Sequence, residues 1–538
     1  MSAGRLRGGP VALVVAAALL VAAALAGAAG HAGQATRHLT GSDLLARAYA
    51  SILDADFERA ARDTAEACGP APKEACQLMA LTAERWQIEL DLDNRARDAR
   101  LLTRIGEAIV ATEAWSRREP GRAEAWFYLG VAYGMRAQMH GIRLERFAAA
   151  RDGTRIKAAL ERALAIDPGL ADAHFGIGLY RYLAGVVPAP VRLLLWLLML
   201  PGGDRVTGLQ EMLAAREHGE LLRGEADFQM HWYYLWYEHQ PEQALSLLEG
   251  LRARYPRNPI FMWRIAEVQD ASFHDLAASR DMYRSLVEAA ASGGVGAPYT
   301  AGVRGRLGLA EQEDALYESD RAIELLGAVI AARPAAPYGA LARAHYLLGV
   351  AQDRLGRRGP AVEAYRAAIA AAPPDDPAGV RDLARKHIGR ASDAKTADAY
   401  RLSLEGWRLV ERGALADAAA PLARSLELDP ADPVARFRLG LFYQARGEHG
   451  RARAEFERTL AARPLAPPTF LAAAYVEMGR ALEREAQPER ATEMYRAATR
   501  IRGAEARTLG DARAALVRLR AVTAAIAGAA TRGPRSDR

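Results

Sequence analysis

The sequence predicts an all-α protein built as a right-handed solenoid of helix-turn-helix units, with a helical cap at each end. Three observations predict this fold class. Strand signals are nearly absent, while Ala, Leu, Arg and Glu dominate the 538 residues. One segment recurs after 34 residues, so that Gly406 is repeated as Gly440 and Pro430 as Pro464. Finally, a chain of this length exceeds what one compact core accommodates, whereas a solenoid grows by adding neighbours.

The repeated residues indicate how the two helices of one unit pack together. The second copy carries the pattern Leu439, Gly440, Tyr443, Ala452, Phe456 and Pro464. Gly and Ala let two helices approach closely, the aromatic residues fill the space between them, and Pro ends the second helix. This pattern resembles the tetratricopeptide repeat. The resemblance covers most of residues 124–502 in roughly eight units, is strongest from residue 342 onward, and implies a concave groove lined by the first helix of each unit.

The first 30 residues predict export. Arg5 and Arg7 precede an uncharged run, Val11–Gly30, that ends in small residues. This pattern indicates a signal peptide, with a retained membrane anchor over residues 11–30 as the alternative. In either case we expect most of the protein to be exported, to the periplasm or as a secreted protein. Residues 42–122 do not fit the repeat, and we expect two long helices there that cap the leading edge of the array.

Cys68 and Cys76 flank a turn that is rich in Gly and Pro. In an oxidising compartment we expect them to form a disulfide worth about 2–3 kcal/mol. Two unpaired buried thiols are the alternative. No His lies beside them, so the pair makes a poor zinc site.

One stretch of the irregular array at 123–290 is apolar on nearly every side. Residues 183–203 form an insertion whose expected short helix carries Val191, Leu194, Trp196 and Leu197. This helix is too short to span a membrane. The insertion either folds back against the solenoid or presents an exposed patch that contacts a partner or a membrane surface.

The densest aromatic cluster of the chain lies at residues 231–239. On a helix these side chains point in all directions, so we expect several of them to pack in the core. The others are candidates for a groove in which rings stack on a sugar or a peptide. The candidate residues are His231, Trp232, Tyr234 and Trp236.

The second half of the chain is expected to form a regular array at 302–503, preceded by a Gly-rich hinge at 291–305. A capping helix at 504–528 and a disordered tail at 529–538 follow. The resemblance to the tetratricopeptide repeat implies a partner-binding groove at the helix positions that line the groove in that family, in the repeats from residue 342 onward. For the aromatic residues at these positions, packing between repeats is the alternative. These positions are Arg343, Tyr346, Val350, Ser403, Trp407, Phe437, Leu441, Gln444, Val476 and Arg480.

The sequence offers no catalytic signature such as a nucleophile elbow, a zinc-protease motif, a phosphate loop or a Rossmann glycine pattern. We therefore expect no enzyme, no cofactor and no metal. The net charge of +6 comes from Arg interleaved with Glu and Asp, which argues against a nucleic-acid partner. The leading hypothesis is a non-catalytic scaffold of a bacterial cell envelope that binds a peptide segment or a helix of another protein. The alternative is a module that binds a saccharide or an envelope polymer through residues 231–239.

Overall fold

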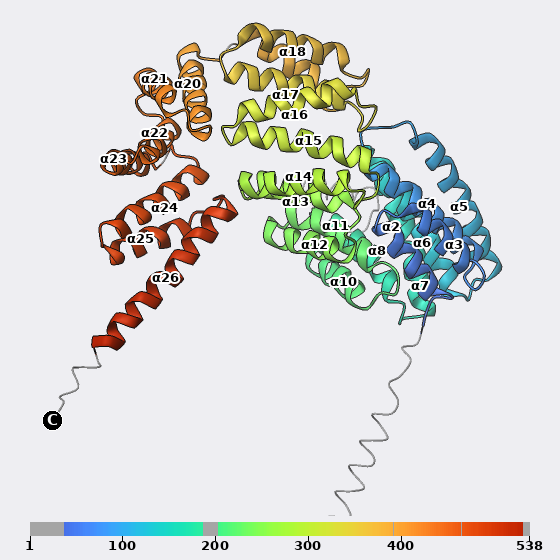
Figure 1. Ribbon diagram of the computed structural model, residues 1–538. Helices are drawn as coiled ribbons and strands as arrows, with labels where there is room; N and C mark the ends of the chain where they lie inside the picture. Colours follow the sequence, from blue (N-terminus) through green and yellow to red (C-terminus); the bar gives the residue numbers. More distant parts are fainter. Residues whose placement is uncertain (1–36, 187–202, 391, 464, 531–538) are drawn as a thin grey trace, which may run out of the picture.

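The computed structural model describes residues 37–186, 203–390, 392–463 and 465–530. In these ranges the chain forms 24 α-helices and no strand. The helices, labelled as in Figure 1, are α2 (Ser42–Leu53), α3 (Phe57–Ala67), α4 (Lys73–Glu89), α5 (Asp98–Arg118), α6 (Ala123–Ile142), α7 (Arg146–Ile166), α8 (Ala171–Val186), α10 (Arg205–His218), α11 (Arg223–Trp236), α12 (Pro241–Arg254), α13 (Pro259–Ala271), α14 (Leu276–Ala291), α15 (Pro298–Ala315), α16 (Ser319–Ala332), α17 (Ala340–Arg354), α18 (Arg358–Ala371), α19 (Val380–Gly389), α20 (Ala394–Glu411), α21 (Leu415–Leu428), α22 (Pro433–Ala445), α23 (His449–Ala461), α24 (Pro468–Arg484), α25 (Pro488–Thr499) and α26 (Ala506–Ala530). Among these described helices, none is both long and apolar enough to cross a membrane.

Several expectations fall on other parts of the chain. The export segment at 1–30, the core of the insertion at 187–202 and the end of the tail at 531–538 lie outside the described residues. Two residues of the expected tail, 529 and 530, do not belong to a tail, because α26 continues to Ala530.

The helices pack as successive antiparallel pairs stacked along an arc, from α6 and α7 to α24 and α25, with α19 alone between two pairs (Figure 1). We call the first helix of each pair helix A, and the side of the array formed by these helices the A face. The repeat residues explain the pairing: a Cβ added to Gly349 in α17 would lie 2.4 Å from the ring of Tyr365 in α18. Gly440 and Phe456 repeat this contact at 2.5 Å. The predicted all-α helix-turn-helix solenoid is confirmed.

Residues 42–118 form four helices, α2 to α5, in place of the two long helices expected. These helices do more than cap one end of the array, because α2 and α4 also pack against the A helices α11 and α13. The Trp86 ring of α4 lies 4.8 Å from Phe228 and 6.1 Å from Phe261 between ring centroids. Asn258 donates from Nδ2 to the carbonyl of Leu53 at 2.7 Å. The N-terminal helices therefore occupy the A face of the first repeats.

A buried ion pair fastens these helices to α11. Glu225 of α11 accepts two hydrogen bonds from Nη2 of Arg85, at 2.9 and 2.8 Å, and one from the hydroxyl of Tyr49 at 2.6 Å. Trp86 donates to the same carboxylate from Nε1 at 3.2 Å. All four side chains are buried. Since every strong polar group here has a partner, the pair links α2 and α4 to α11 without leaving an unsatisfied charge.

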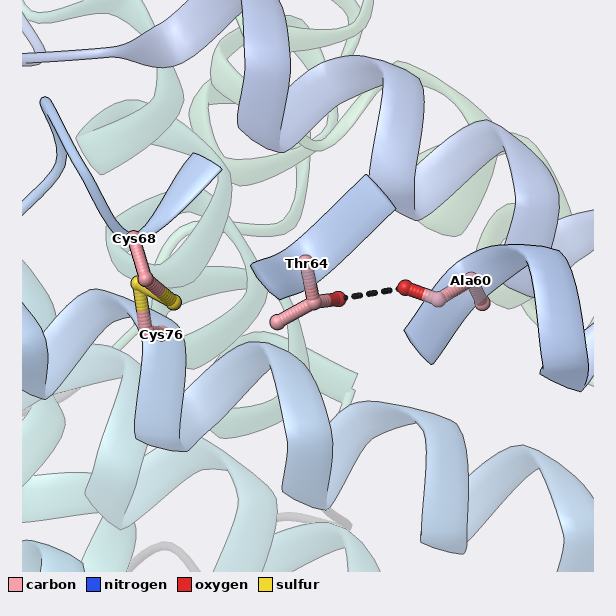
Figure 2. The surroundings of a disulfide bond; sticks show 4 residues. All are labelled: Ala60, Thr64, Cys68 and Cys76. Atoms are coloured by element: carbon pink, nitrogen blue, oxygen red, sulfur yellow. Dashed lines mark hydrogen bonds between the residues drawn. A yellow bond between two sulfur atoms is a disulfide. The ribbon is translucent and has the colours of Figure 1, made fainter. Parts of the chain in front are cut away.

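The two cysteines form a disulfide between the end of α3 and the first turn of α4 (Figure 2). The Cα atoms of Cys68 and Cys76 are 5.7 Å apart, within the usual range for such a bond. Nearby in α3, the Thr64 hydroxyl donates to the carbonyl of Ala60 at 2.7 Å. The disulfide closes the short turn that separates the two helices.

The Gly-rich loop between α14 and α15 is packed and does not form the expected hinge. Val295 is buried, and Gly296 donates its amide hydrogen to the carbonyl of Arg257 at 2.8 Å. A Cβ on Gly296 would lie 2.5 Å from the carbonyl oxygen of Ala55. Gly296 therefore allows close contact with the turn that follows α2, and a Gly-rich sequence does not distinguish such a contact from a flexible hinge.

The last repeats curl back around earlier ones. The turn between α15 and α16 carries Tyr317, whose ring lies 5.7 Å from Tyr400 in α20 and 5.8 Å from Phe470 in α24. Farther along, the guanidinium of Arg502 stacks on Phe273 at 4.3 Å. Residues more than 200 positions apart in the sequence thus meet, and the A face of α20, α22 and α24 receives the α15–α16 turn.

Candidate functional site

Most of the expected groove in the C-terminal repeats is occupied by the chain itself. Ser403, Phe437 and Val476 are buried. The Ser403 hydroxyl accepts a hydrogen bond from Nη1 of Arg438 at 3.1 Å, and Nη2 of the same guanidinium donates to the carbonyl of Tyr317 at 2.7 Å. These three residues are core residues, so their assignment to an open partner-binding groove is wrong. Ser403 lies beside the α15–α16 turn, Phe437 packs against rings of α23 and α24, and Val476 packs in the core formed by α24 to α26.

Other expected groove residues in this region are engaged as well. Trp407 is half-buried and packs in the cluster formed around Tyr400. Leu441 is half-buried beside the core of α22 to α24. Gln444 donates from Nε2 to Glu477 at 2.9 Å. Arg480 is exposed and forms an ion pair with Asp511 of α26 at 2.8 Å.

On α17 the expected groove positions remain accessible. Arg343 is exposed and pairs with Glu311 of α15 at 2.7 Å. Tyr346 and Val350 are half-buried on the same side of the helix. The Tyr346 ring meets the His387 ring edge-on, with centroids 5.7 Å apart.

The aromatic cluster on α11 divides between core and surface. His231 is fully buried, and burial lowers its pKa to about 3, so the imidazole is neutral at physiological pH. Tyr234 is half-buried against α8 and α10. Trp236 is 67% exposed, and its ring lies nearly parallel to that of the half-buried Trp232, with centroids 6.5 Å apart. Of the four candidates, Trp236 presents the largest accessible aromatic surface.

Arg264 of α13 connects the indoles to the following helices. Its guanidinium stacks on Trp232 at 4.7 Å from the ring centroid, and Nη1 pairs with Glu267 at 2.7 Å. We define the open strip as five residues on the A face of α11, α13 and α17 that keep some exposed surface, such as Trp236, which is 67% exposed, and Arg264, whose side chain is 16% exposed. Its residues are Trp232, Trp236, Arg264, Arg343 and Tyr346. The strip combines aromatic faces with ion pairs at its rim.

Sequence reasoning found Trp232, Trp236, Arg343 and Tyr346 but missed Arg264. For the neighbouring helix α15, the sequence carried a weak signal. Arg304 precedes Ala310 by six residues, as Arg343 precedes Gly349, and this spacing indicates that Arg304 occupies the same A-face position as Arg343. The insertion residues Val191, Leu194, Trp196 and Leu197 lie outside the described part of the chain.

Residues 342–375 match the family model described as tetratricopeptide repeat, and these residues form the antiparallel pair of α17 and α18. Residues 342–375 thus form one tetratricopeptide repeat, within an array of antiparallel helix pairs. The match indicates no enzymatic family. Across the described ranges, no cluster of three or more His, Cys, Asp or Glu side chains is arranged to hold a metal ion.

Three solved structures illustrate the similarity of this chain to known proteins. A tetratricopeptide repeat protein from Parabacteroides merdae is 16% identical, over 55% of this chain and 98% of its own, with a TM-score of 0.26. Human IFIT1, solved as a dimer with PPP-AAAA, is 14% identical over 79% of this chain and 94% of its own, with a TM-score of 0.33. The P58(IPK) TPR domain is 14% identical over 81% of this chain and 98% of its own, with a TM-score of 0.23. TM-scores this low say nothing about what the present chain binds. No curated protein matches the sequence.

Proposed function

We propose that this protein is a non-catalytic scaffold of the cell envelope that binds another protein on the open strip. Tetratricopeptide repeats generally bind proteins, and their helix A residues supply the contacts. Here the N-terminal helices cover part of the A face of α11 and α13, and the α15–α16 turn covers part of that of α20, α22 and α24. The observation that carries the proposal is that the uncovered part holds Trp236, which is 67% exposed.

The chemistry of the strip suits a protein partner. Trp, Tyr and Arg dominate the binding energy of protein interfaces, because they bury a large area with little loss of conformational entropy. Arg264 and Arg343 are each paired with a Glu of the same face. The strip therefore carries little net charge, and we expect an extended segment or helix with an apolar anchor for the indoles.

The proposed location rests on two features of the N-terminal part. The basic and apolar pattern of residues 5–30 is that of an export signal or anchor. The Cys68–Cys76 disulfide suits an oxidising compartment outside the cytosol. Both support a scaffold that faces the periplasm or the exterior.

The test is a crosslinking pull-down from the native envelope, with captured proteins identified by mass spectrometry. We expect Trp236→Ala and Arg343→Glu to lose a protein that the unmodified chain captures. Phe147→Ala is the control for an exposed aromatic, since Phe147 is 92% exposed in another part of the molecule. Arg366→Glu on α18 is the control for charge reversal on the second helix of the pair. Equal capture by all four variants would rule out the strip as the binding surface.

A saccharide or envelope-polymer fragment is the second candidate ligand. The nearly parallel and partly exposed rings of Trp232 and Trp236 favour it, because flat aromatic faces stack on sugar rings. A titration of envelope glycans monitored by tryptophan fluorescence tests this idea, with Trp236→Ala as the variant. A flat response over the whole panel excludes the saccharide ligand and leaves the protein partner.

A further inference from the structure

A small cavity opens beside the open strip, where six parts of the chain converge. Its volume is about 70 Å³. The loop after α4, helices α13, α14 and α15, the start of α17 and the loop before α19 all line it. A cavity needs at least about 10–15 Å³ to hold one water molecule, so this space can hold a few waters or a small organic anion.

Arg304 of α15 lines this cavity beside Glu267 but forms no ion pair with it, since Glu267 is paired with Arg264. The Arg304 guanidinium stacks on Trp263 at 4.5 Å from the ring centroid, but it forms no hydrogen bond or ion pair with another described residue. Its Nε atom is buried and unsatisfied. Burial lowers the pKa of Arg304, the negative charge of Glu267 acts in the opposite direction, and the guanidinium stays charged. Arg304 is half-buried, so its charge is partly desolvated, which is costly unless an anion compensates it.

Tyr283 of α14 supplies a second unpartnered donor. Its side chain is only 9% exposed and lines the cavity, and its hydroxyl has no hydrogen-bond partner among the described residues. Burial raises the pKa of Tyr283, so the hydroxyl keeps its proton and can donate. The ring is held in place by α15, because it lies against Gly308, where an added Cβ would be 2.4 Å away.

The start of α17 adds partial positive charge. Ala340 and Ala342 line the cavity, and no side chain caps this helix at Gly339. The first amide groups of a helix lack intrahelical acceptors, and together with the helix dipole they favour a negative group.

The carboxylates around the cavity are already committed or solvated. Glu267 pairs with Arg264 at 2.7 Å. Asp376 accepts hydrogen bonds from the amides of Val380 and Arg381 at 3.0 and 2.9 Å. Asp93 is exposed at the rim. They leave Arg304 without a partner, and their negative charge disfavours a ligand that carries two charges.

We propose that this cavity binds a small organic monoanion whose carboxylate pairs with Arg304 and accepts a hydrogen bond from Tyr283. The start of α17 completes the site with the partial positive charge of its helix dipole. The volume limits the part of the ligand inside the cavity to the size of acetate or propionate. The site adjoins the open strip, because Arg343 lines the cavity as well. Its proposed contacts with the ligand come from Arg304 and Tyr283, which are not part of the open strip.

The test is calorimetric titration of the full chain at neutral pH with acetate, propionate, N-acetylglycine and inorganic phosphate. We expect binding of acetate or propionate. Tighter binding of N-acetylglycine would also support the carboxylate site, and would assign it to a ligand that reaches out of the cavity. Binding of phosphate alone, or of none of the four probes, overturns the proposal.

Variants locate the binding. Because charge-assisted hydrogen bonds are the stronger ones, Arg304→Met should weaken carboxylate binding by about 10- to 100-fold, and Tyr283→Phe by about 3- to 10-fold. Arg306→Met, two residues away on α15, is the matched control and should bind as the unmodified chain does. Thermal unfolding of each variant distinguishes a loss of binding from a loss of folding. If Arg304→Met does not fold, Tyr283→Phe still tests the site, because it removes only the hydroxyl and keeps the ring in contact with Gly308. Unchanged affinity in folded Arg304→Met refutes the site.

Discussion

The buried ion pair between Arg85 and Glu225 should hold the N-terminal helices on the array. Glu225→Leu removes the acceptor of Tyr49 and Trp86 and leaves the guanidinium of Arg85 with only Glu89, at 3.3 Å. Breaking a buried pair on one side typically costs about 3–5 kcal/mol, since the remaining charge stays desolvated. We expect a loss of this size, confined to α2, α4 and the helices that they contact.

Hydrogen exchange measured by mass spectrometry is the suitable assay, because a long repeat array need not unfold in one step. Amides of α2 and α4 should exchange about 150- to 4,000-fold faster in Glu225→Leu, the rate equivalent of the expected loss. Amides of α24 and α25 should not change. The double variant Arg85→Met/Glu225→Leu should lose only about 1–3 kcal/mol, because the Tyr49 hydroxyl still lacks its acceptor but no charge is left unpaired.

The surface pair of Arg424 and Glu427 is the control, with side chains 62% and 61% exposed and a separation of 2.6 Å. Glu427→Leu should change local stability by less than about 1 kcal/mol, as for other solvated pairs. If Glu225→Leu leaves the exchange of α2 and α4 as it was, the ion pair does not fasten these helices. A double variant that is less stable than Glu225→Leu alone would contradict the account based on an unpaired charge.

Three further predictions concern pH, packing and redox state. Burial holds the pKa of His231 at about 3, below its usual 6.5, so only the unfolded chain takes up this proton as the pH falls. Stability should therefore drop by up to about 1.4 kcal/mol per pH unit between those values, and thermal unfolding of His231→Phe from pH 7 to 4 should show a shallower slope. Gly349→Ala should lower stability by about 1–3 kcal/mol, because the added Cβ meets the ring of Tyr365. Gly327→Ala should raise stability by about 0.5–1 kcal/mol, because an added Cβ there has nothing within 4 Å and Ala favours the helix. The melting temperatures of the two variants, each compared with that of the unmodified chain, test this pair of predictions. Replacing Cys68 and Cys76 by Ser should cost about 2–3 kcal/mol, seen as faster exchange in α3 and α4, and a reducing agent should reproduce the effect in the unmodified chain.

The sequence was a good guide wherever the deciding contact is local. Gly349 and Tyr365 lie 16 positions apart in one helix pair, and the same small and aromatic types recur in Gly440 and Phe456. Each repeat touches mainly its neighbours, so a pattern within 34 residues specifies the helices, their pairing and their order. For the same reason, the position of the turn between Cys68 and Cys76 was readable from the sequence.

The candidate site was only partly predictable. Trp236, Arg343 and Tyr346 were named from the sequence and are accessible, but Ser403 and Phe437 were named by the same reasoning and are buried. Apolar and small residues at helix A positions serve equally well to bind a partner or to pack against the chain itself. No pattern within one repeat distinguishes these two uses.

The amino-acid sequence by itself determined that this protein is an all-α array of tetratricopeptide repeats. Only the tertiary structure decided which part of the A face stays open. Arg85 meets Glu225 across 140 positions and Tyr317 meets Phe470 across 153, and both contacts depend on the angles between successive repeats summed over the intervening helices. Small differences in each packing angle add up along a solenoid, so the place where the chain returns on itself is a property of the whole array.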